Sequence, residues 1–377
     1  MHGGCVTPDQ STRIAVGVMT GTSLDGVDAC AIRLEGRGLE MRAEHLGFVS
    51  TPLGPLAEEL RVLCTGGRTT ARSIAGLRTA LGIRCAEAVQ RLGLDRIDLV
   101  AVHGQTVHHD ADGSWQLLDP TPVAHRHRCA VVGDLRSVDR AAGGEGAPIT
   151  PMADWILHRA DQPRAIVNLG GFINCTLLPG ADAADPCGSI EGFDVCPCNH
   201  LLDAIARSTL DLPFDKDGAM AATGSVCIEQ LAPLSTHLSD LRKEQRSLGS
   251  GDEELARMRT LARAIGGPDA AATTCAAIAS SVARALKPHP VQEVLLAGGG
   301  ALNRALVAAI DDALNGQAVV GRLPHGAERE AAAMAVLGAL AWDGVPITLA
   351  GVTGRADTHV RDGTWVLPKD SMDVQTP

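Results

Sequence analysis

The sequence predicts a mixed α/β protein built from two lobes, and three observations support this. The chain has 377 residues, which exceeds one ordinary domain and suits two of middling size. Apolar residues make up 45% and charged residues 20%, a globular balance with ample material for a core. Strand–helix alternation occurs in both halves, and glycine and polar residues follow the strands directly, where an α/β sheet places its ligand-binding groups.

The elements follow from runs of apolar residues and their spacing. Predicted strands are 14–19, 27–34, 99–102, 129–132, 165–167, 190–194 and 294–296. Predicted helices are 81–92, one opening near Asn199, 275–286, 302–314 and 334–341. A glycine-rich stretch at 134–151 predicts the boundary, giving an N-terminal lobe of 1–134 and a C-terminal lobe of 135–377, with the last helix able to pack back on the N-terminal lobe.

Composition excludes several classes of protein. The net charge of −11, without a basic run, disfavours DNA and RNA as partners, and four Phe, four Trp and no Tyr offer few platforms for stacking bases. No window reaches the roughly 18 apolar residues of a membrane span, and the first residues lack a signal-peptide pattern. Eleven scattered cysteines do not form a disulfide framework, so we expect a cytoplasmic protein.

Two segments could hold phosphates. A P-loop is excluded because the chain contains no Gly-Lys pair. Gly298–Gly300 lies between a strand and a helix, and it is either part of a dinucleotide site or a plain tight turn. The segment from Gly17 to Asp28 is rich in glycine and hydroxyls that can donate to phosphate oxygens, and Asp25 or Asp28 could hold Mg²⁺; the alternative is a hairpin with capped turn residues.

That segment and the blocks after it resemble the anhydro-N-acetylmuramic acid kinases of the actin/hexokinase/Hsp70 superfamily. The resemblance runs from about Gly17 to Gly354, with its blocks in one order. The blocks are His103-Gly104-Gln105-Thr106-Val107, Leu118-Asp119-Pro120, Gly133-Asp134-Leu135-Arg136 with Asp139, 142–148, Asn168-Leu169-Gly170-Gly171, Gly192-Phe193-Asp194, Asp215-Lys216-Asp217-Gly218, 298–303, Glu330 and Val352-Thr353-Gly354.

The resemblance implies a two-lobed actin/hexokinase-type (ribonuclease H-like) fold with ATP in the interdomain cleft. It implies an ATP- and Mg²⁺-dependent kinase that hydrolyses the 1,6-anhydro ring of 1,6-anhydro-N-acetylmuramic acid and phosphorylates O6, giving N-acetylmuramic acid 6-phosphate in peptidoglycan recycling. It also implies a homodimer. The alternatives are a kinase of the same fold for another sugar and a nucleotide-binding protein without catalysis.

The resemblance also implies site residues. Asp194 matches the base that activates water, although by itself it could be a helix N-cap or turn residue. The residues implied for ATP are Gly17, Thr20, Gly21, Thr22, Ser23, Asp25, Gly26, Asn168, Gly170, Gly171, Gly298, Gly299, Gly300 and Asn303. Those implied for the sugar are His103, Gln105, Arg136, Asp139 and Glu330. No residue is predicted to ligate a structural metal.

The sequence departs from the family pattern at several positions. Cys196-Pro197-Cys198-Asn199 replaces Gly-Pro-Gly-Asn, Glu145 replaces Gln, and Asp154 and Ala327 also differ. Cysteine and histidine at 187, 196, 198 and 200 offer zinc ligands, but Cys-x-Cys spacing is less usual than Cys-x-x-Cys, and buried thiols are the alternative. Histidines 103, 108 and 109 could indicate the metal-dependent carbamoyl-transfer branch of the superfamily or simply be hydrogen-bonded.

Overall fold

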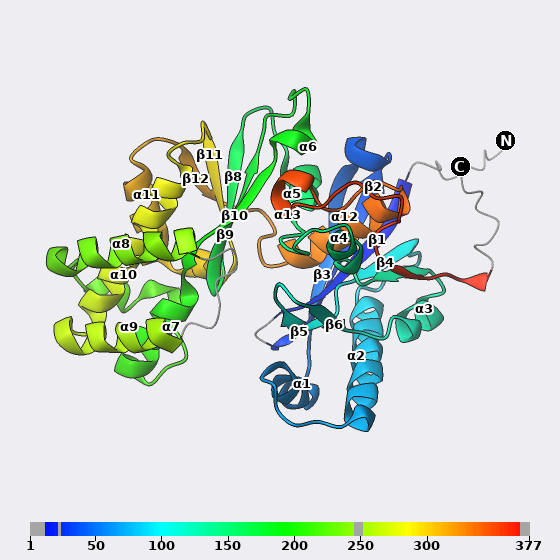
Figure 1. Cartoon of the computed structure of the whole chain (residues 1–377), viewed down its shortest axis with the longest axis horizontal. Helices are drawn as coiled ribbons and strands as arrows, with labels where there is room; N and C mark the ends of the chain where they lie inside the picture. The colour runs from blue at the N-terminus through cyan, green and yellow to red at the C-terminus, as the bar shows by residue number, and fades with distance from the viewer. Residues whose placement is uncertain (1–11, 22–23, 245–251, 370–377) are drawn as a thin grey trace, which may run out of the picture. The chain divides into compact units, whose positions relative to one another are not determined.

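The computed structural model of the chain describes residues 12–21, 24–244 and 252–369 and divides into two compact units (Figure 1). The first comprises 1–158 and 328–377 and the second 159–327. The boundary predicted at residue 134 is therefore wrong. The segment 135–158 belongs to the first unit because helix α5 (Pro151–His158) packs on strand β3 (Arg42–Pro52), and the chain returns to that unit through α12 (Arg329–Trp342), which packs on the same sheet.

The first unit is built on a six-stranded sheet in the order β13-β7-β4-β1-β2-β3. Strands β1, β2 and β3 are antiparallel, β4 and β7 run parallel to β1, and β13 closes the edge antiparallel to β7. Besides β3, the strands of this sheet are β1 (Thr12–Thr20), β2 (Gly26–Glu35), β4 (Leu99–Val102), β7 (Ala130–Gly133) and β13 (Thr364–Val366). The hairpin β5 (Gln105–His109) and β6 (Ser114–Leu117) forms a separate sheet.

Helices cover both faces of this sheet. Val16, Val18 and Val27 on one face pack with Leu81 and Val89 of α2 (Ala71–Arg91) in one hydrophobic cluster. Helix α12 packs against β1, β2 and β4. The remaining helices of this unit are α1 (Leu56–Cys64), α3 (Thr121–His127), α4 (Ser137–Ala141), α13 (Ala350–Thr353) and the 3₁₀ turn η1 (Gly38–Glu40).

The second unit repeats this topology in a five-stranded sheet of order β10-β9-β8-β11-β12. Strands β8, β9 and β10 are antiparallel, and β11 and β12 run parallel to β8. Their bounds are β8 (Arg164–Leu169), β9 (Phe172–Leu178), β10 (Glu191–Pro197), β11 (Glu293–Ala297) and β12 (Val319–Arg322). The predicted mixed α/β fold in two units is confirmed.

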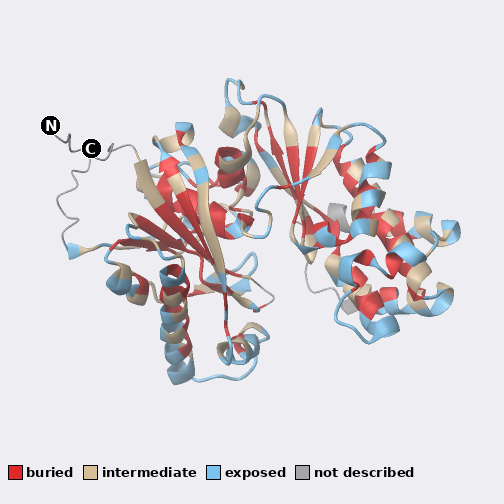
Figure 2. Cartoon of the chain, turned by 180° about the vertical axis from the view of Figure 1, so that it is seen from behind, coloured by how far each residue is buried: buried red, intermediate tan, exposed pale blue. Residues whose placement is uncertain are grey.

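Helices α7 (Asn199–Leu210), α10 (Gly267–Leu286) and α11 (Arg304–Leu314) share one hydrophobic cluster with the second sheet, which places the core on one of its faces. Figure 2 shows the buried strands of both sheets in red. The other helices of this unit are α6 (Pro186–Ser189), α8 (Ile228–Glu244), α9 (Asp252–Ile265), η2 (Lys216–Gly218), η3 (Ala221–Thr223) and η4 (Gly299–Leu302).

Candidate active-site groups in the two units

The connection between β1 and β2 offers a buried hydroxyl and a turn. Thr20, the last residue of β1, is buried, and its hydroxyl has no hydrogen-bond partner within the described residues. Gly21 accepts a hydrogen bond from the amide of Leu24 (3.2 Å), whose φ of 59° tightens the turn. The predicted contacts Thr22 and Ser23 lie outside the described residues. A buried hydroxyl without a partner beside a tight turn can donate to an oxyanion.

Two carboxylates follow this turn. Asp25 is exposed and Asp28 is half-buried on β2. Burial raises the pKa of Asp28, the nearby charge of Asp25 adds to this rise, and a hydrogen bond with the side chain of Ser50 opposes it. Two carboxylates that repel each other in this way fit an oxygen-coordinated cation such as Mg²⁺.

The two glycines that flank this loop lie close to neighbouring backbone atoms. Gly17 is buried in the middle of β1, between Cys30 of β2 and Ala101 of β4. A Cβ atom there would overlap the carbonyl oxygen of Ala331 and the amide nitrogen of Ala335, so the absent side chain lets α12 approach the sheet. A Cβ on Gly26 would lie 3.0 Å from the carbonyl oxygen of Thr51 on β3.

His103 and Arg136 form a linked pair after β4 and β7. The Nε of Arg136 donates to Nε2 of His103 (3.0 Å), and Nη1 donates to the carbonyl oxygen of Gly146 (2.6 Å). Nδ1 of His103 lies 3.0 Å from the carbonyl oxygen of Gly104, so Nδ1 carries the proton. Burial, then the Arg136 charge, lowers the pKa of His103 to about 3, so its ring is neutral.

Arg136 stays cationic in this pair. Burial lowers its pKa to about 10, and the charges of Glu330 and Asp139 oppose this. Its Nη2 makes no hydrogen bond within the described residues, so it can donate to an anionic or polar ligand. Both nitrogens of His103 are engaged, Nε2 of His108 pairs with Asp110 (2.9 Å), and Nδ1 of His109 lies 2.9 Å from the Ser114 hydroxyl. These hydrogen bonds support the non-metal interpretation of the three histidines.

Asp139 and Gln105, both predicted to contact the sugar, are buried. The Asp139 carboxylate accepts hydrogen bonds from the hydroxyls of Thr348 (2.5 Å) and Thr353 (2.7 Å) and from the amide of Gly146 (2.7 Å). Asp139 therefore ties the loop that Arg136 contacts to the segment around α13. The Oε1 of Gln105 has no hydrogen-bond partner within the described residues and remains available.

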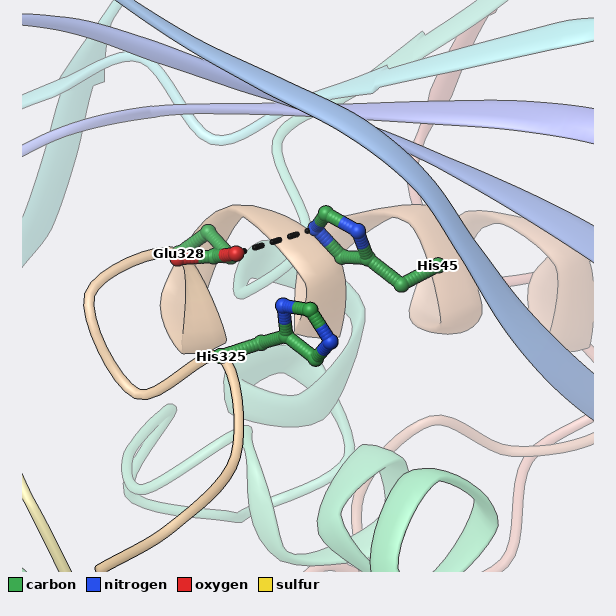
Figure 3. Close-up of side chains that lie close together, drawn as sticks. All are labelled: His45, His325 and Glu328. Atoms are coloured by element: carbon green, nitrogen blue, oxygen red, sulfur yellow. Dashed lines mark ion pairs between the residues drawn. The ribbon is translucent and has the colours of Figure 1, made fainter.

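The first turn of α12 is held by two ion pairs. Nε and Nη2 of Arg329 bind the two carboxylate oxygens of Asp154 at 2.9 and 2.5 Å, and both side chains are buried. Nε2 of His45 lies 3.1 Å from Oε1 of Glu328, the ion pair drawn in Figure 3. Glu330 follows directly and is exposed. The unexpected Asp154 is thereby explained, because it neutralises Arg329 beneath the turn that carries Glu330.

In the second unit, Asp194 lies on β10, the edge strand of the sheet. The pairing with β9 shifts register between Asp194 and Cys196, which marks a β-bulge immediately after Asp194. The carboxylate is half-buried and makes no hydrogen bond or ion pair within the described residues, and burial alone raises its pKa. Asp194 is a strand residue, so the N-cap alternative does not hold; the N-cap of α7 is Cys198.

The glycine turns of this unit bring β8 and β11 together. Gly298 has φ 77°, and a Cβ there would lie 2.7 Å from Oδ1 of Asn168 and 2.8 Å from the carbonyl oxygen of Leu169. A Cβ on Gly300 would lie 2.7 Å from Cβ of Leu169. Asn303 caps α11, since its Oδ1 accepts from the amide of Leu306 (3.0 Å). Gly299 is the least crowded of the three glycines, with only the Asn199 side chain nearby.

The Cys196–Asn199 segment is compatible with the conformation of the β8–β9 turn. The amides of Cys198 and Asn199 donate to the carbonyl oxygens of Gly171 (2.8 Å) and Gly170 (3.1 Å). Cys198 has φ −132°, so this position does not require the glycine of the family pattern. Both thiols lie in the hydrophobic cluster of this unit, and burial raises the pKa of Cys198.

Two units that repeat one sheet topology, with polar groups near the turn after the first strand of each, are the arrangement expected for the two-lobed actin/hexokinase class. A family model described as anhydro-N-acetylmuramic acid kinase matches residues 13–364. The relative from Salinibacter ruber with this name is 33% identical over 92% of this chain and 94% of its own. The relative from Acidiphilium cryptum is 36% identical over 90% and 94%, and that from Chromohalobacter salexigens is 41% identical over 58% and 60%.

The chain belongs to the anhydro-N-acetylmuramic acid kinase family. The predicted family, the two-lobed fold and the prediction that the chain is a kinase are confirmed. Within the described residues, no helix combines the length and the apolar character needed to cross a membrane.

Proposed function

We propose that the chain opens the 1,6-anhydro ring of 1,6-anhydro-N-acetylmuramic acid with water and transfers the γ-phosphoryl group of ATP to O6. The observation that carries this proposal is Asp194, a half-buried carboxylate on a bulged edge strand with no protein partner within the described residues. A structural carboxylate in such a place would normally be paired. An unpaired one suits a general base.

The proposed reaction has a hydrolytic step and a phosphoryl-transfer step. Asp194 takes a proton from water, the water oxygen bonds to the anomeric carbon, and the bond from that carbon to O6 breaks. O6 then attacks the γ-phosphorus of ATP, ADP leaves, and the product is N-acetylmuramic acid 6-phosphate. Phosphoryl transfer of this kind depends mainly on positioning and charge stabilisation. The product would serve peptidoglycan recycling in the cytoplasm.

The sugar is proposed to contact Arg136, Glu330, His103 and Gln105. Nη2 of Arg136 is available to a carboxylate or hydroxyl of the sugar, and exposed Glu330 can accept from hydroxyls. Neutral His103 fixes the guanidinium plane without adding charge. Asp139 supports the loop beneath them.

Each unit offers a group of residues proposed for ATP, in the β1–β2 connection of the first unit and in the glycine turns of the second. Thr20, Gly21, Thr22, Ser23, Asp25 and Gly26 form the first group, and Asn168, Gly170, Gly171, Gly298, Gly299, Gly300 and Asn303 form the second. Mg²⁺ would be held by Asp25 and Asp28, where it would neutralise charge on the phosphates. We further propose that the chain acts as a homodimer.

The test is mass spectrometry of the protein incubated with ATP, Mg²⁺ and the anhydro sugar in ¹⁸O-water, quenched early. We expect a 6-phosphate that carries one heavy oxygen at the anomeric position. N-Acetylmuramic acid and glucose, offered in place of the anhydro sugar, test a kinase for another sugar. Phosphorylation of either, with no product from the anhydro sugar, would refute the proposal, as would a product without heavy oxygen.

A further inference from the structure

A row of polar residues crosses the edge of the second sheet beside Asp194. In the strand register, Asp194 of β10 lies directly opposite Asn174 of β9, and Asn174 lies directly opposite Asn168 of β8. Directly opposed residues of antiparallel strands point to the same face, with Cβ atoms about 4.5–5.5 Å apart. An asparagine side chain is long enough to span that gap to a carboxylate.

This row lies on the sheet face opposite the core. The hydrophobic cluster takes Ile173 and Cys175 from β9 and Val167 and Leu169 from β8, and side chains alternate along a strand. Asn168, Asn174 and Asp194 therefore point away from that cluster, and all three are half-buried.

Within the described residues, Asn174 is the residue that the strand register places directly opposite Asp194. Strand β10 is at the edge of the described sheet and borders β9, and the bulge directly after Asp194 shifts the register before the pairing resumes at Cys196. The side chains of Asn174 and Asp194 make no hydrogen bond within the described residues, so the Asn174 amide is available as a donor.

Among the side chains that the structure describes, no charge acts on Asp194 strongly enough to shift its pKa. The elements packed against β10 carry Glu229, His237 and Asp240 on α8 and Asp269, Cys275 and Arg284 on α10, while Glu191 and Cys196 lie on β10 itself. His289 stacks on Phe193. None of them contributes to the raised pKa of Asp194, which comes from burial alone. A neutral N–H donor is therefore the group within reach that can favour the ionised carboxylate.

We propose that Asn174 is a positioning residue whose side-chain amide, unpaired within the described residues, turns to donate to the Asp194 carboxylate, fixing the direction of the carboxylate and keeping it ionised. This inference rests on the proposed role of Asp194 as base. A positioning amide that stabilises the charged form lowers the pH at which the base becomes active.

The test is the pH profile of kcat/KM for the anhydro sugar in Asn174→Leu, Asn174→Asp and the matched variant Asn168→Leu. In Asn174→Leu the acid limb should move up by about one pH unit, so that activity below it falls about tenfold. Asn174→Asp, which is nearly isosteric, adds a like charge and should move the limb further. Asn168 lies two strands from Asp194, about 9.6 Å, so its variant should leave the acid limb in place even if the KM for ATP rises.

The outcomes separate this inference from the proposed function. If Asp194→Asn abolishes turnover but the acid limb stays in place in both Asn174 variants, the positioning role is refuted and the base remains. An equal shift of the acid limb in Asn168→Leu would also refute the positioning role, because the effect would then not depend on lying directly opposite Asp194. Turnover retained in Asp194→Asn would overturn both proposals.

Discussion

The two units share one strand order but use the same positions differently. In each unit, the first three strands pair side by side, and the residues one position before the end of the first strand can be compared with their cross-strand partners. In the first unit these residues are Met19, Asp28 and Ser50, and in the second they are Asn168, Asn174 and Asp194. In the first unit the carboxylate is Asp28, on the middle one of these three strands, and in the second unit it is Asp194, on the edge strand. In the first unit it is hydrogen-bonded to Ser50, and in the second it has no partner within the described residues. The same topology thus places one carboxylate, Asp28, where it can bind a cation and another, Asp194, where it can act as a base.

A second difference lies two residues further from the turn. Gly17 in β1 corresponds to Ile166 in β8, and both are buried on the sheet face away from the cluster that contains their strand neighbours. In the first unit α12 occupies the space that a side chain would need, whereas in the second the space holds a full isoleucine side chain. The glycine is therefore a packing requirement of one unit and not of the shared topology.

The largest expected effect comes from Asp194→Asn. An amide cannot accept the proton, so kcat should fall by about 10² to 10⁴, while the fold and ATP binding stay intact. Steady-state kinetics measures kcat, and calorimetry measures the binding of ATP to the folded variant.

Asp203→Asn is the matched control for that variant. Asp203 is also half-buried in the second unit, and burial raises its pKa to about 6, but it lies on α7 near Arg207 (3.7 Å). Its variant should keep activity within about twofold, since a raised pKa alone does not make a base. Activity above half the wild-type value in Asp194→Asn would contradict the assignment.

The sequence predicted the buried strands well because they are continuous apolar runs. Leu99–Val102 was predicted to the residue, and the strands on both sides of the first turn were predicted to within two residues. Strand β3 was missed because it is an edge strand with one buried residue, and β9 because it begins directly after the glycine turn. The register that places Asn174 beside Asp194 needs β9, so this neighbour could not be predicted.

Long-range packing could not be predicted from the sequence either. The Arg329–Asp154 pair joins residues 175 positions apart, and the return of α12 to the first sheet, rather than a local boundary signal, divides the units. Gly17 illustrates the same limit. Its place in a glycine- and hydroxyl-rich segment indicated phosphate binding, but only the approach of α12 explains why a side chain is excluded there.

Gly17→Ala tests this packing and should have the next largest effect. The added methyl group would overlap backbone atoms of Ala331 and Ala335, so α12 must shift, and the free energy of unfolding should fall by about 1–3 kcal/mol. Urea denaturation measures it. In the matched variant Gly47→Ala, on β3 of the same sheet, the nearest atom to the new Cβ would be Cδ2 of Leu92 at 4.0 Å. That variant should change stability by less than about 1 kcal/mol, and equal losses in both would refute the role assigned to α12.

An effect confined to acidic pH concerns His103, a buried and neutral side chain of the first unit, whereas the proposed base of the second unit is a half-buried carboxylate. The pKa of His103 is about 3 in the folded protein and about 6.5 when unfolded. Between these values the unfolded chain binds the extra proton, so the stabilising contribution is complete above pH 6.5 and is lost as the pH falls. For one such group, the slope of the free energy of unfolding against pH is at most about 1.4 kcal/mol per pH unit.

His103→Gln, which keeps an acceptor for Nε of Arg136 but does not titrate, should remove most of that slope between about pH 6 and pH 4. Urea denaturation across this range gives the difference between wild type and variant, and exposed His125→Gln is the control that should leave the wild-type slope unchanged. If His103→Gln and the wild type lose stability in parallel as the pH falls, then His103 is protonated in the folded protein. In that case Arg136 could not donate to its Nε2, and the proposed sugar-binding pair of neutral His103 and cationic Arg136 would be wrong.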